Sequence, residues 1–185
     1  MAWKNGPRTE AETRVASIVG GNTCQLRVHR GLSQKQLAEK AGCSLSVLSH
    51  IERGARNSHG SLSSVSVDLL VAFAEELETT PQWLLNEHKN LIDSLQRDKE
   101  TFRFEKSRSK NFYASVVGER VRQWRESKKM TLTQLVEMMT AKGVRIDKSG
   151  LAQIERNYNN RSVSVDMFTV FVELMGTTAH KLLQS

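Results

Sequence analysis

The sequence has few prolines, cysteines and aromatic residues, and it lacks a long apolar run. Its 185 residues include two prolines and two cysteines, and 6% of them are aromatic. Few prolines and no strand-like alternation of apolar and polar residues predict an all-α chain with modest cores. No apolar stretch reaches the roughly 18 residues of a membrane span, and the N-terminus has no signal-peptide core. We therefore expect a cytoplasmic protein with no membrane partner.

Arrangements of catalytic or metal-binding residues are also missing. The spacing of Cys24, Cys43 and the five histidines does not match a metal site, and no nucleophile-elbow or phosphate-loop motif is present. Cys43 is expected to be a buried free thiol in a reducing compartment. The sequence therefore predicts neither an enzyme nor a protein with a cofactor, a metal or a small-molecule ligand.

Positive charge is in excess. The net charge is +7 and the pI is near 9.6, which suits a polyanionic partner such as nucleic acid. Residues 1–86 carry nine basic and eight acidic side chains, residues 87–110 seven and five, and residues 111–185 eleven and seven. Most of the excess therefore lies in the C-terminal part of the chain.

Residues 32–54, LSQKQLAEKAGCSLSVLSHIERG, predict two short amphipathic helices joined by a tight turn. Ser33 and Ser44 are the expected N-caps, and Gly42 can adopt the left-handed conformation that ends the first of these helices. The inner stripe of the second helix is apolar, with Val47, Leu48 and Ile51. Its outer face is mostly short, polar and basic, which suits a helix lying in a DNA major groove.

This stretch resembles the lambda-repressor-like (Cro/XRE-type) helix-turn-helix family, whose motif runs roughly LSQxxLAxxxGxSxxxxSxIERG. The matching residues are Leu32, Ser33, Gln34, Leu37, Ala38, Gly42, Ser44, Ser49, Ile51, Glu52, Arg53 and Gly54. The resemblance implies a five-helix domain that binds double-stranded DNA. The DNA contacts it implies are Gln34, Leu45, Ser46 and His50 at or near the bases, with Arg53, Arg56 and Asn57 on phosphate. Ser44 and Ser49 are further candidate DNA contacts.

Flanking segments complete this predicted domain. A helix is expected from about Glu10 to His29, with Leu26 and Val28 facing the core. The Gly-Gly pair at residues 20–21 leaves open a break into two helices. A later helix, residues 65–77, is expected to turn Asp68 toward water.

The second part of the chain repeats the first. Leu135 follows Leu37 by 98 residues, Ile154 follows Ile51 by 103, and the segment SVSVD occurs at both 64–68 and 162–166. An internal repeat of this length predicts two copies of one fold.

The two copies differ at residues that would meet DNA. In the second copy, residues 141–150 lengthen the turn before the recognition helix, which Asp147 is expected to cap. Leu132 stands where the first copy has Gln34. Lysine and glutamine, which suit major-groove base edges, appear on the outer face. The candidate DNA contacts here are Lys148, Ser149, Gln153, Arg156, Asn159, Asn160 and Arg161, with Arg156 and Arg161 on phosphate.

The repeat divides the chain into a helix-turn-helix domain (1–86), a charged linker (87–110) and a second, diverged helix-turn-helix domain (111–185). A leucine stripe predicts that the linker continues the last helix of the first domain to about Glu100 and then becomes a flexible joint. A solvated spacer is the alternative. The predicted fold is all-α, with two tandem five-helix domains joined by a partly helical linker.

These features predict a sequence-specific transcriptional repressor that binds double-stranded DNA and acts by occupancy. Small regulators of this build resemble temperate-phage immunity repressors. Two unlike reading helices on one chain imply an asymmetric site bound by a monomer. The alternative is an antitoxin-like or host regulator whose second domain binds a protein partner or dimerises.

Overall fold

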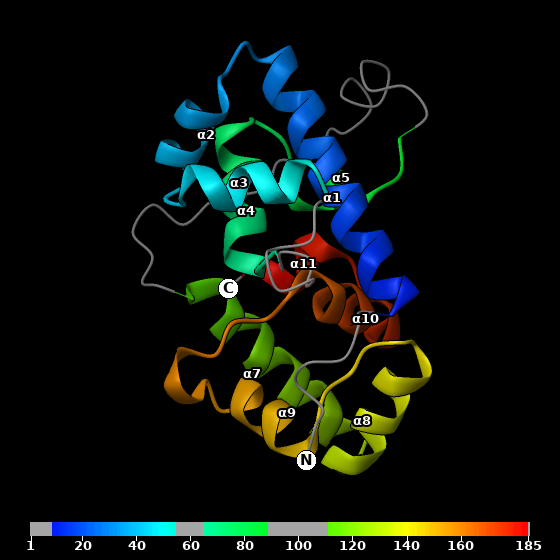
Figure 1. The fold of residues 1–185 in the computed structure, drawn as a ribbon. Helices are drawn as coiled ribbons and strands as arrows, with labels where there is room; N and C mark the ends of the chain where they lie inside the picture. Colours follow the sequence, from blue (N-terminus) through cyan, green and yellow to red (C-terminus); the bar gives the residue numbers. More distant parts are fainter. Residues whose placement is uncertain (1–8, 55–64, 89–110, 185) are drawn as a thin grey trace.

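Helices are the regular elements of the described part of the chain. The computed structural model describes residues 9–54 and 65–88, here called the first half, and residues 111–184, the second half (Figure 1). The first half contains α1 (Glu10–His29), α2 (Gln34–Lys40), α3 (Leu45–Glu52), α4 (Val67–Glu76) and α5 (Pro81–Leu85). The second half contains α7 (Phe112–Ser127), α8 (Leu132–Ala141), α9 (Lys148–Glu155), a 3₁₀ turn η1 (Tyr158–Asn160), α10 (Val165–Met175) and α11 (Ala179–Leu183). The predicted all-α class is confirmed.

The glycine pair does not break the first helix, because α1 is continuous. A Cβ atom on Gly20 would lie 2.1 Å from the carbonyl oxygen of Ile51, so α3 crosses α1 at a contact that only glycine permits. Gly118 in α7 repeats this arrangement, with a Cβ position 2.2 Å from the carbonyl oxygen of Ile154 in α9. These glycines therefore bring α3 and α9 close to the helices that carry them.

Two details of the first half differ from the sequence-based expectation. Leu26 is fully buried, as predicted, but Val28 is 62% exposed because it lies on the outer side of the last turn of α1. Cys43 is a free thiol, as predicted, but it is only half-buried. No helix among the described residues is long and apolar enough to cross a membrane.

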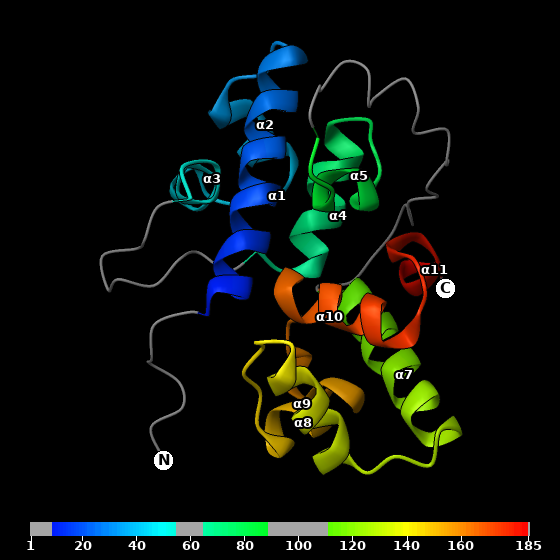
Figure 2. The same ribbon diagram turned by 90° about the vertical axis from the view of Figure 1, so that its right-hand side faces the viewer.

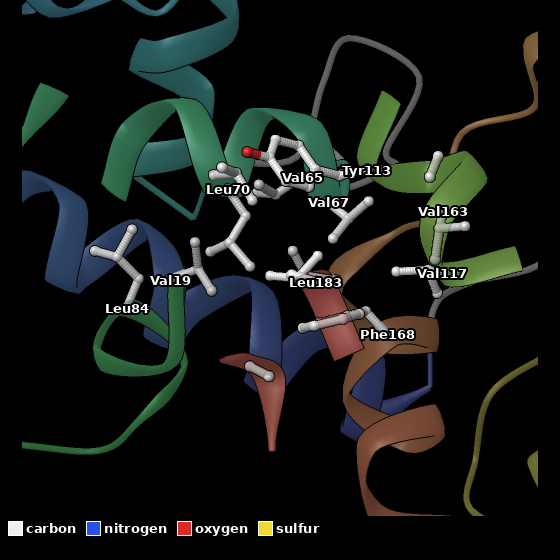
Figure 3. Close-up of a cluster of buried hydrophobic side chains, with 14 of the residues drawn as sticks. Val19, Val65, Val67, Leu70, Leu84, Tyr113, Val117, Val163, Phe168 and Leu183 are labelled. Atoms are coloured by element: carbon white, nitrogen blue, oxygen red, sulfur yellow. The ribbon is translucent and has the colours of Figure 1, made fainter. Parts of the chain in front are cut away.

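The two halves share one hydrophobic core (Figure 3). Its almost fully buried members come from both halves and include Val65, Val67, Leu70, Val163 and Phe168. At the junction the Val67 N–H donates to the Val163 carbonyl (2.8 Å), and the Val165 N–H donates to the Val65 carbonyl (2.9 Å). The segments that lead into α4 and α10 thus form an isolated antiparallel bridge, and each half completes the core of the other.

Polar contacts also join the halves. Asp68 accepts hydrogen bonds from the N–H groups of Tyr113 (2.9 Å) and Ala114 (3.3 Å), so it caps the first turn of α7. The prediction that Asp68 faces water is wrong, because its partners lie in the other half of the chain. The Gln82 side chain accepts a bond from the Ala179 N–H (3.1 Å) at the start of α11.

The end of α5 contradicts the start of the predicted linker helix. Helix α5 stops at Leu85, and the backbone of the next residue is extended. The His88 ring stacks on Trp83 with 4.1 Å between ring centroids, and its Nε2 lies 2.7 Å from the Trp83 carbonyl oxygen. The chain therefore folds back on α5 instead of continuing as a helix. The rest of the predicted linker, residues 89–110, lies outside the described residues.

Candidate nucleic-acid interface

Helices α2 and α3 form the predicted helix-turn-helix. The hydroxyl of Ser33 accepts a hydrogen bond from the Gln36 N–H, and the Gln36 side chain accepts one from the Ser33 N–H, which completes a capping box. Gly42 has a φ of +69° in the turn, and the Ser44 hydroxyl caps α3. The caps and the turn that the sequence predicted are confirmed. Because the Ser44 hydroxyl holds the start of α3, a DNA contact by Ser44 would share that oxygen.

The outer surface of α3 is more apolar than the sequence suggested. Leu45 is 48% exposed, and Val47, predicted to face the core, is 40% exposed. The prediction for Val47 is wrong because α3 packs mainly through Leu48 and Ile51, which are buried. Exposed apolar side chains beside Ser46 can contact thymine methyl groups in a major groove.

His50 has a defined hydrogen-bonding role on α3. Its Nδ1 lies 2.6 Å from the Ser46 carbonyl oxygen and 3.4 Å from the Ser46 hydroxyl. A carbonyl oxygen can only accept, so Nδ1 must carry the proton, and the Nε2 of the neutral ring is then an acceptor. His50 can therefore accept a hydrogen bond from an exocyclic amino group of cytosine or adenine.

Arg53, at the C-terminal end of α3, folds back on the same helix. Its Nε donates to the Ser49 carbonyl (3.1 Å) and its Nη2 to the Ser49 hydroxyl (2.7 Å). The guanidinium is thus held in place while it stays exposed, as a phosphate contact requires. Arg56 and Asn57, the other two predicted phosphate contacts of this half, lie outside the described residues.

A buried ion pair fixes α3 to α1. The Glu52 carboxylate is 2% exposed and binds Arg27 through Nε (2.6 Å) and Nη2 (2.8 Å), and Arg27 also donates to the Leu32 carbonyl. Gln34 adds a third donor, 2.8 Å from Glu52. Burial alone would raise the pKa of Glu52, but these hydrogen bonds and the Arg27 charge outweigh it and lower the pKa. Gln34 is therefore a supporting residue of α3 as well as a predicted DNA contact.

The second half repeats this ion pair without the glutamine. Arg125 binds the 4% exposed Glu155 carboxylate through Nε and Nη2, both at 2.7 Å, and donates to the Met130 carbonyl. Leu132, at the position equivalent to Gln34, packs against the core and offers no donor. An equivalent ion pair thus fixes α9 to α7, but its carboxylate receives one hydrogen bond fewer than Glu52 does.

The predicted contacts on α9 fall into two groups. Asp147 caps the helix as predicted, accepting from the Gly150 N–H at 2.6 Å, and Lys148 and Ser149 are exposed on the first turn. Gln153 is half-buried, and its Oε1 accepts a hydrogen bond from Arg161 at 2.8 Å. Gln153 and Arg161 are thus engaged with each other, and Gln153 also donates to the Ser149 hydroxyl at 3.5 Å, whereas Lys148 is exposed to a ligand.

The loop after α9 exposes two of the predicted DNA contacts, one of them a predicted phosphate contact, Arg156. Arg156 and Asn159 are exposed, and nothing is described of the Asn160 side chain. Tyr158, which the sequence reading overlooked, is 58% exposed between two residues of positive φ, Asn157 (+48°) and Asn159 (+53°). Asparagine adopts positive φ more readily than most residues, so the sequence NYNN was a signal of a turn that could have pointed to Tyr158.

Helices α3 and α9 lie on the same side of the molecule. Both face the viewer in Figure 1, and in Figure 2, turned by 90°, α3 stands at the left edge and α9 lies to the left of α7. The shared core fixes this arrangement. No group of three or more His, Cys, Asp or Glu residues in the described ranges is placed to hold a metal ion.

Comparison with known proteins agrees with the geometry of the first half. Residues 25–84 match the family model described as helix-turn-helix, and the match does not extend to the second half. No curated protein and no solved structure matches the chain. The matched family is a DNA-binding, non-enzymatic one, and such a domain implies sequence-specific DNA binding and transcriptional regulation. Residues 25–84 are thus a helix-turn-helix domain of the Cro/XRE type.

Proposed function

We propose that this protein is a transcriptional repressor that binds an asymmetric double-stranded DNA site as a monomer, with α3 and α9 as its two reading helices. The observation that supports the proposal is that α3 and α9 lie on one side of one chain, on two halves that share a core (Figures 1 and 2). Both helices cross a glycine of the preceding long helix and are tied to it by an Arg–Glu pair.

Unlike chemistry on the two helices supports an asymmetric site. Helix α3 offers Leu45, Val47 and the acceptor nitrogen of His50, which suit thymine methyl and amino groups. Helix α9 offers Lys148 and Ser149, which suit guanine acceptors and phosphate. A palindrome would require two identical reading helices, which a single chain of this kind does not present.

The internal pairing also supports a monomer. The surfaces around Val65 and Val163 that a symmetric dimer could use are already buried against each other. Repression by occupancy, as in the temperate-phage immunity repressors that this build resembles, requires only that the protein cover its DNA site. We propose the same role in phage immunity for this protein.

Selection of bound sites from random DNA, with the mass of the complex measured by light scattering, tests this function. We expect one undivided, non-palindromic site bound by one chain. A palindromic optimum bound by two chains would contradict the proposal.

A second test concerns α9 directly. Lys148→Ala should weaken binding to the selected site by about 1–3 kcal/mol, the usual contribution of one good base contact. Lys181→Ala removes the same charge from α11, which lies on the other side of the molecule in Figure 2, and serves as the control. If both variants bind as tightly as the parent, Lys148 does not read DNA.

The alternative is a regulator whose second half binds a protein partner or dimerises, as antitoxin-like proteins and some host regulators would. The observation in its favour is that the family match is confined to residues 25–84. In that case variants on α9 would leave DNA affinity unchanged, and light scattering would show a dimer or a complex with a protein from the native host.

A further inference from the structure

A groove of about 460 Å³ lies between α7 and α11 in the second half. Its floor contains Trp124, Met175 and Leu182, and two cationic residues, Arg120 and Lys181, line it together with uncharged polar residues. None of the described residues that line it is acidic. The groove therefore combines an apolar floor with two cationic side chains.

In the first half, side chains of the protein itself fill the position that corresponds to this groove. The 98-residue repeat makes Leu26 equivalent to Trp124, Leu77 to Met175 and Trp83 to Lys181. In the first half Leu26 and Leu77 are fully buried and Trp83 is 1% exposed. Their counterparts Trp124 and Met175 are only partly buried, and Lys181 is exposed.

Two side chains cover this position in the first half. The indole of Trp83 is buried, and the ring of His88 stacks on it at 4.1 Å between centroids. The segment after α5 is held there by Asn22, whose Nδ2 donates to the carbonyls of Leu84 (3.0 Å) and Asn86 (2.8 Å). This position of the fold thus accommodates an aromatic side chain together with a short extended segment.

In the second half lysine replaces that tryptophan and Trp124 replaces Leu26, so the indole comes from α7 and no side chain of α11 covers it. Arg120, at the position of Asn22, donates to the Lys181 carbonyl and places its charge at the edge of the groove. The exposed part of Trp124 is an apolar surface beside two cations, a combination that also favours cation–π contacts and acidic partners.

We propose that this groove binds a short acidic segment of another protein that inserts one large aromatic side chain over Trp124 and Met175. The carboxylates of that segment pair with Arg120 and Lys181. The aromatic ring takes the place that Trp83 fills in the first half. The proposal does not depend on how the second half treats DNA.

The position of the groove allows both ligands at once. Helices α7 and α11 lie at the right of Figure 2, and α3 lies at the left edge. A segment bound between α7 and α11 would therefore leave the predicted reading surface open, so the protein could hold a partner while it is on DNA.

The probe for this site is a capped peptide with one tryptophan flanked by two glutamates on each side. It is titrated into ¹⁵N-labelled full-length protein while the indole N–H signal of Trp124, assigned with Trp124→Phe, is followed. We expect a saturable shift, and at least tenfold weaker binding when alanine replaces the tryptophan or lysines replace the glutamates. No shift with the acidic peptide, or equal affinity for the lysine peptide, would overturn the proposal.

Lys181→Trp puts an indole at the position of Trp83, over Trp124, and should abolish peptide binding while DNA binding stays unchanged. Lys142→Trp, an exposed lysine outside the groove, is the matched control and should bind the peptide normally. Lys181→Glu provides a second variant and should weaken binding at least tenfold by charge reversal. Peptide binding that survives both Lys181 changes would overturn the proposal, as would a parent dimer that Lys181→Trp converts to a monomer, because the occupant would then be a second copy.

Discussion

The two halves keep the same supports for the recognition helix and differ in what surrounds them. The Arg–Glu distances are 2.6 Å in the first half and 2.7 Å in the second, and each close-contact glycine lies opposite an isoleucine carbonyl. Two outward positions are identical in α3 and α9, since Ser149 and Arg156 correspond to Ser46 and Arg53. Two others differ, with Lys148 and Gln153 in place of Leu45 and His50. The same few buried contacts therefore position both helices, although the side chains at the start of their outer faces differ.

A second difference is the number of side-chain hydrogen bonds that the buried carboxylate receives in each half. Glu52 has donors from Arg27 and Gln34, but Glu155 receives its side-chain hydrogen bonds from Arg125 alone among the described residues. A third difference is the Trp83 position, which is lysine in the second half. Each difference can be tested by substituting residues of one half with their counterparts from the other, or by deleting one half.

Separating the halves should have the largest effect. Residues 9–88 alone would expose Val65, Val67 and Leu70, which the second half covers, so we expect no cooperative thermal unfolding of this fragment. Circular dichroism and calorimetry of the fragment and of the full chain would measure this. A cooperative transition at nearly the temperature of the full chain would show that the first half is an independent domain.

Removing one partner of the buried ion pairs comes next. Arg125→Leu leaves the Glu155 carboxylate buried without its cation and should cost about 3–5 kcal/mol in urea unfolding. Arg27→Leu should cost less, because Gln34 still donates to Glu52.

The matched double variant sharpens this prediction. Adding Leu132→Gln to Arg125→Leu places an amide where Gln34 stands in the first half and should recover part of the loss. Equal losses for the two arginines, with no recovery, would mean that the glutamine does not stabilise the carboxylate.

Adding a methyl group at the helix crossing should have a smaller effect. Gly20→Ala and Gly118→Ala each force a Cβ against a carbonyl oxygen, and we expect losses of about 1–3 kcal/mol as α3 or α9 shifts outward. Gly21→Ala is the control, because no atom lies within 4 Å of its Cβ position and alanine favours a helix. A destabilised Gly21→Ala with a neutral Gly20→Ala would contradict the crossing geometry.

The smallest effect concerns the pH dependence of the first half. The lowered pKa of Glu52 means that its contribution to stability is complete above the ordinary pKa of glutamate and is lost as the pH falls through the folded-state pKa. Gln34→Leu should raise that pKa, so acid unfolding begins at a higher pH, and should cost about 1 kcal/mol near neutral pH. An unchanged acid transition would show that the Gln34 bond is immaterial.

The sequence predicted the parts of the site that depend on neighbouring residues. The caps at Ser33, Ser44 and Asp147 are confirmed, because an N-cap is decided within three residues of chain. The prediction for Val47 is wrong, because periodicity alone does not show how wide the buried stripe of α3 is. The pairing of Gln153 with Arg161 could not be read from helical spacing, because a 3₁₀ turn and two residues of positive φ lie between them.

The sequence by itself determined the all-α class, the helix-turn-helix at residues 25–84 and the internal repeat. These features follow from local propensity, capping and a motif that is contiguous in the chain. Only the tertiary structure decided that the repeated SVSVD segments pair with each other, that Asp68 caps α7 and that Gly20 faces Ile51. Each of these contacts joins residues far apart in the chain, and burial of apolar surface between the halves selects them without leaving a local pattern.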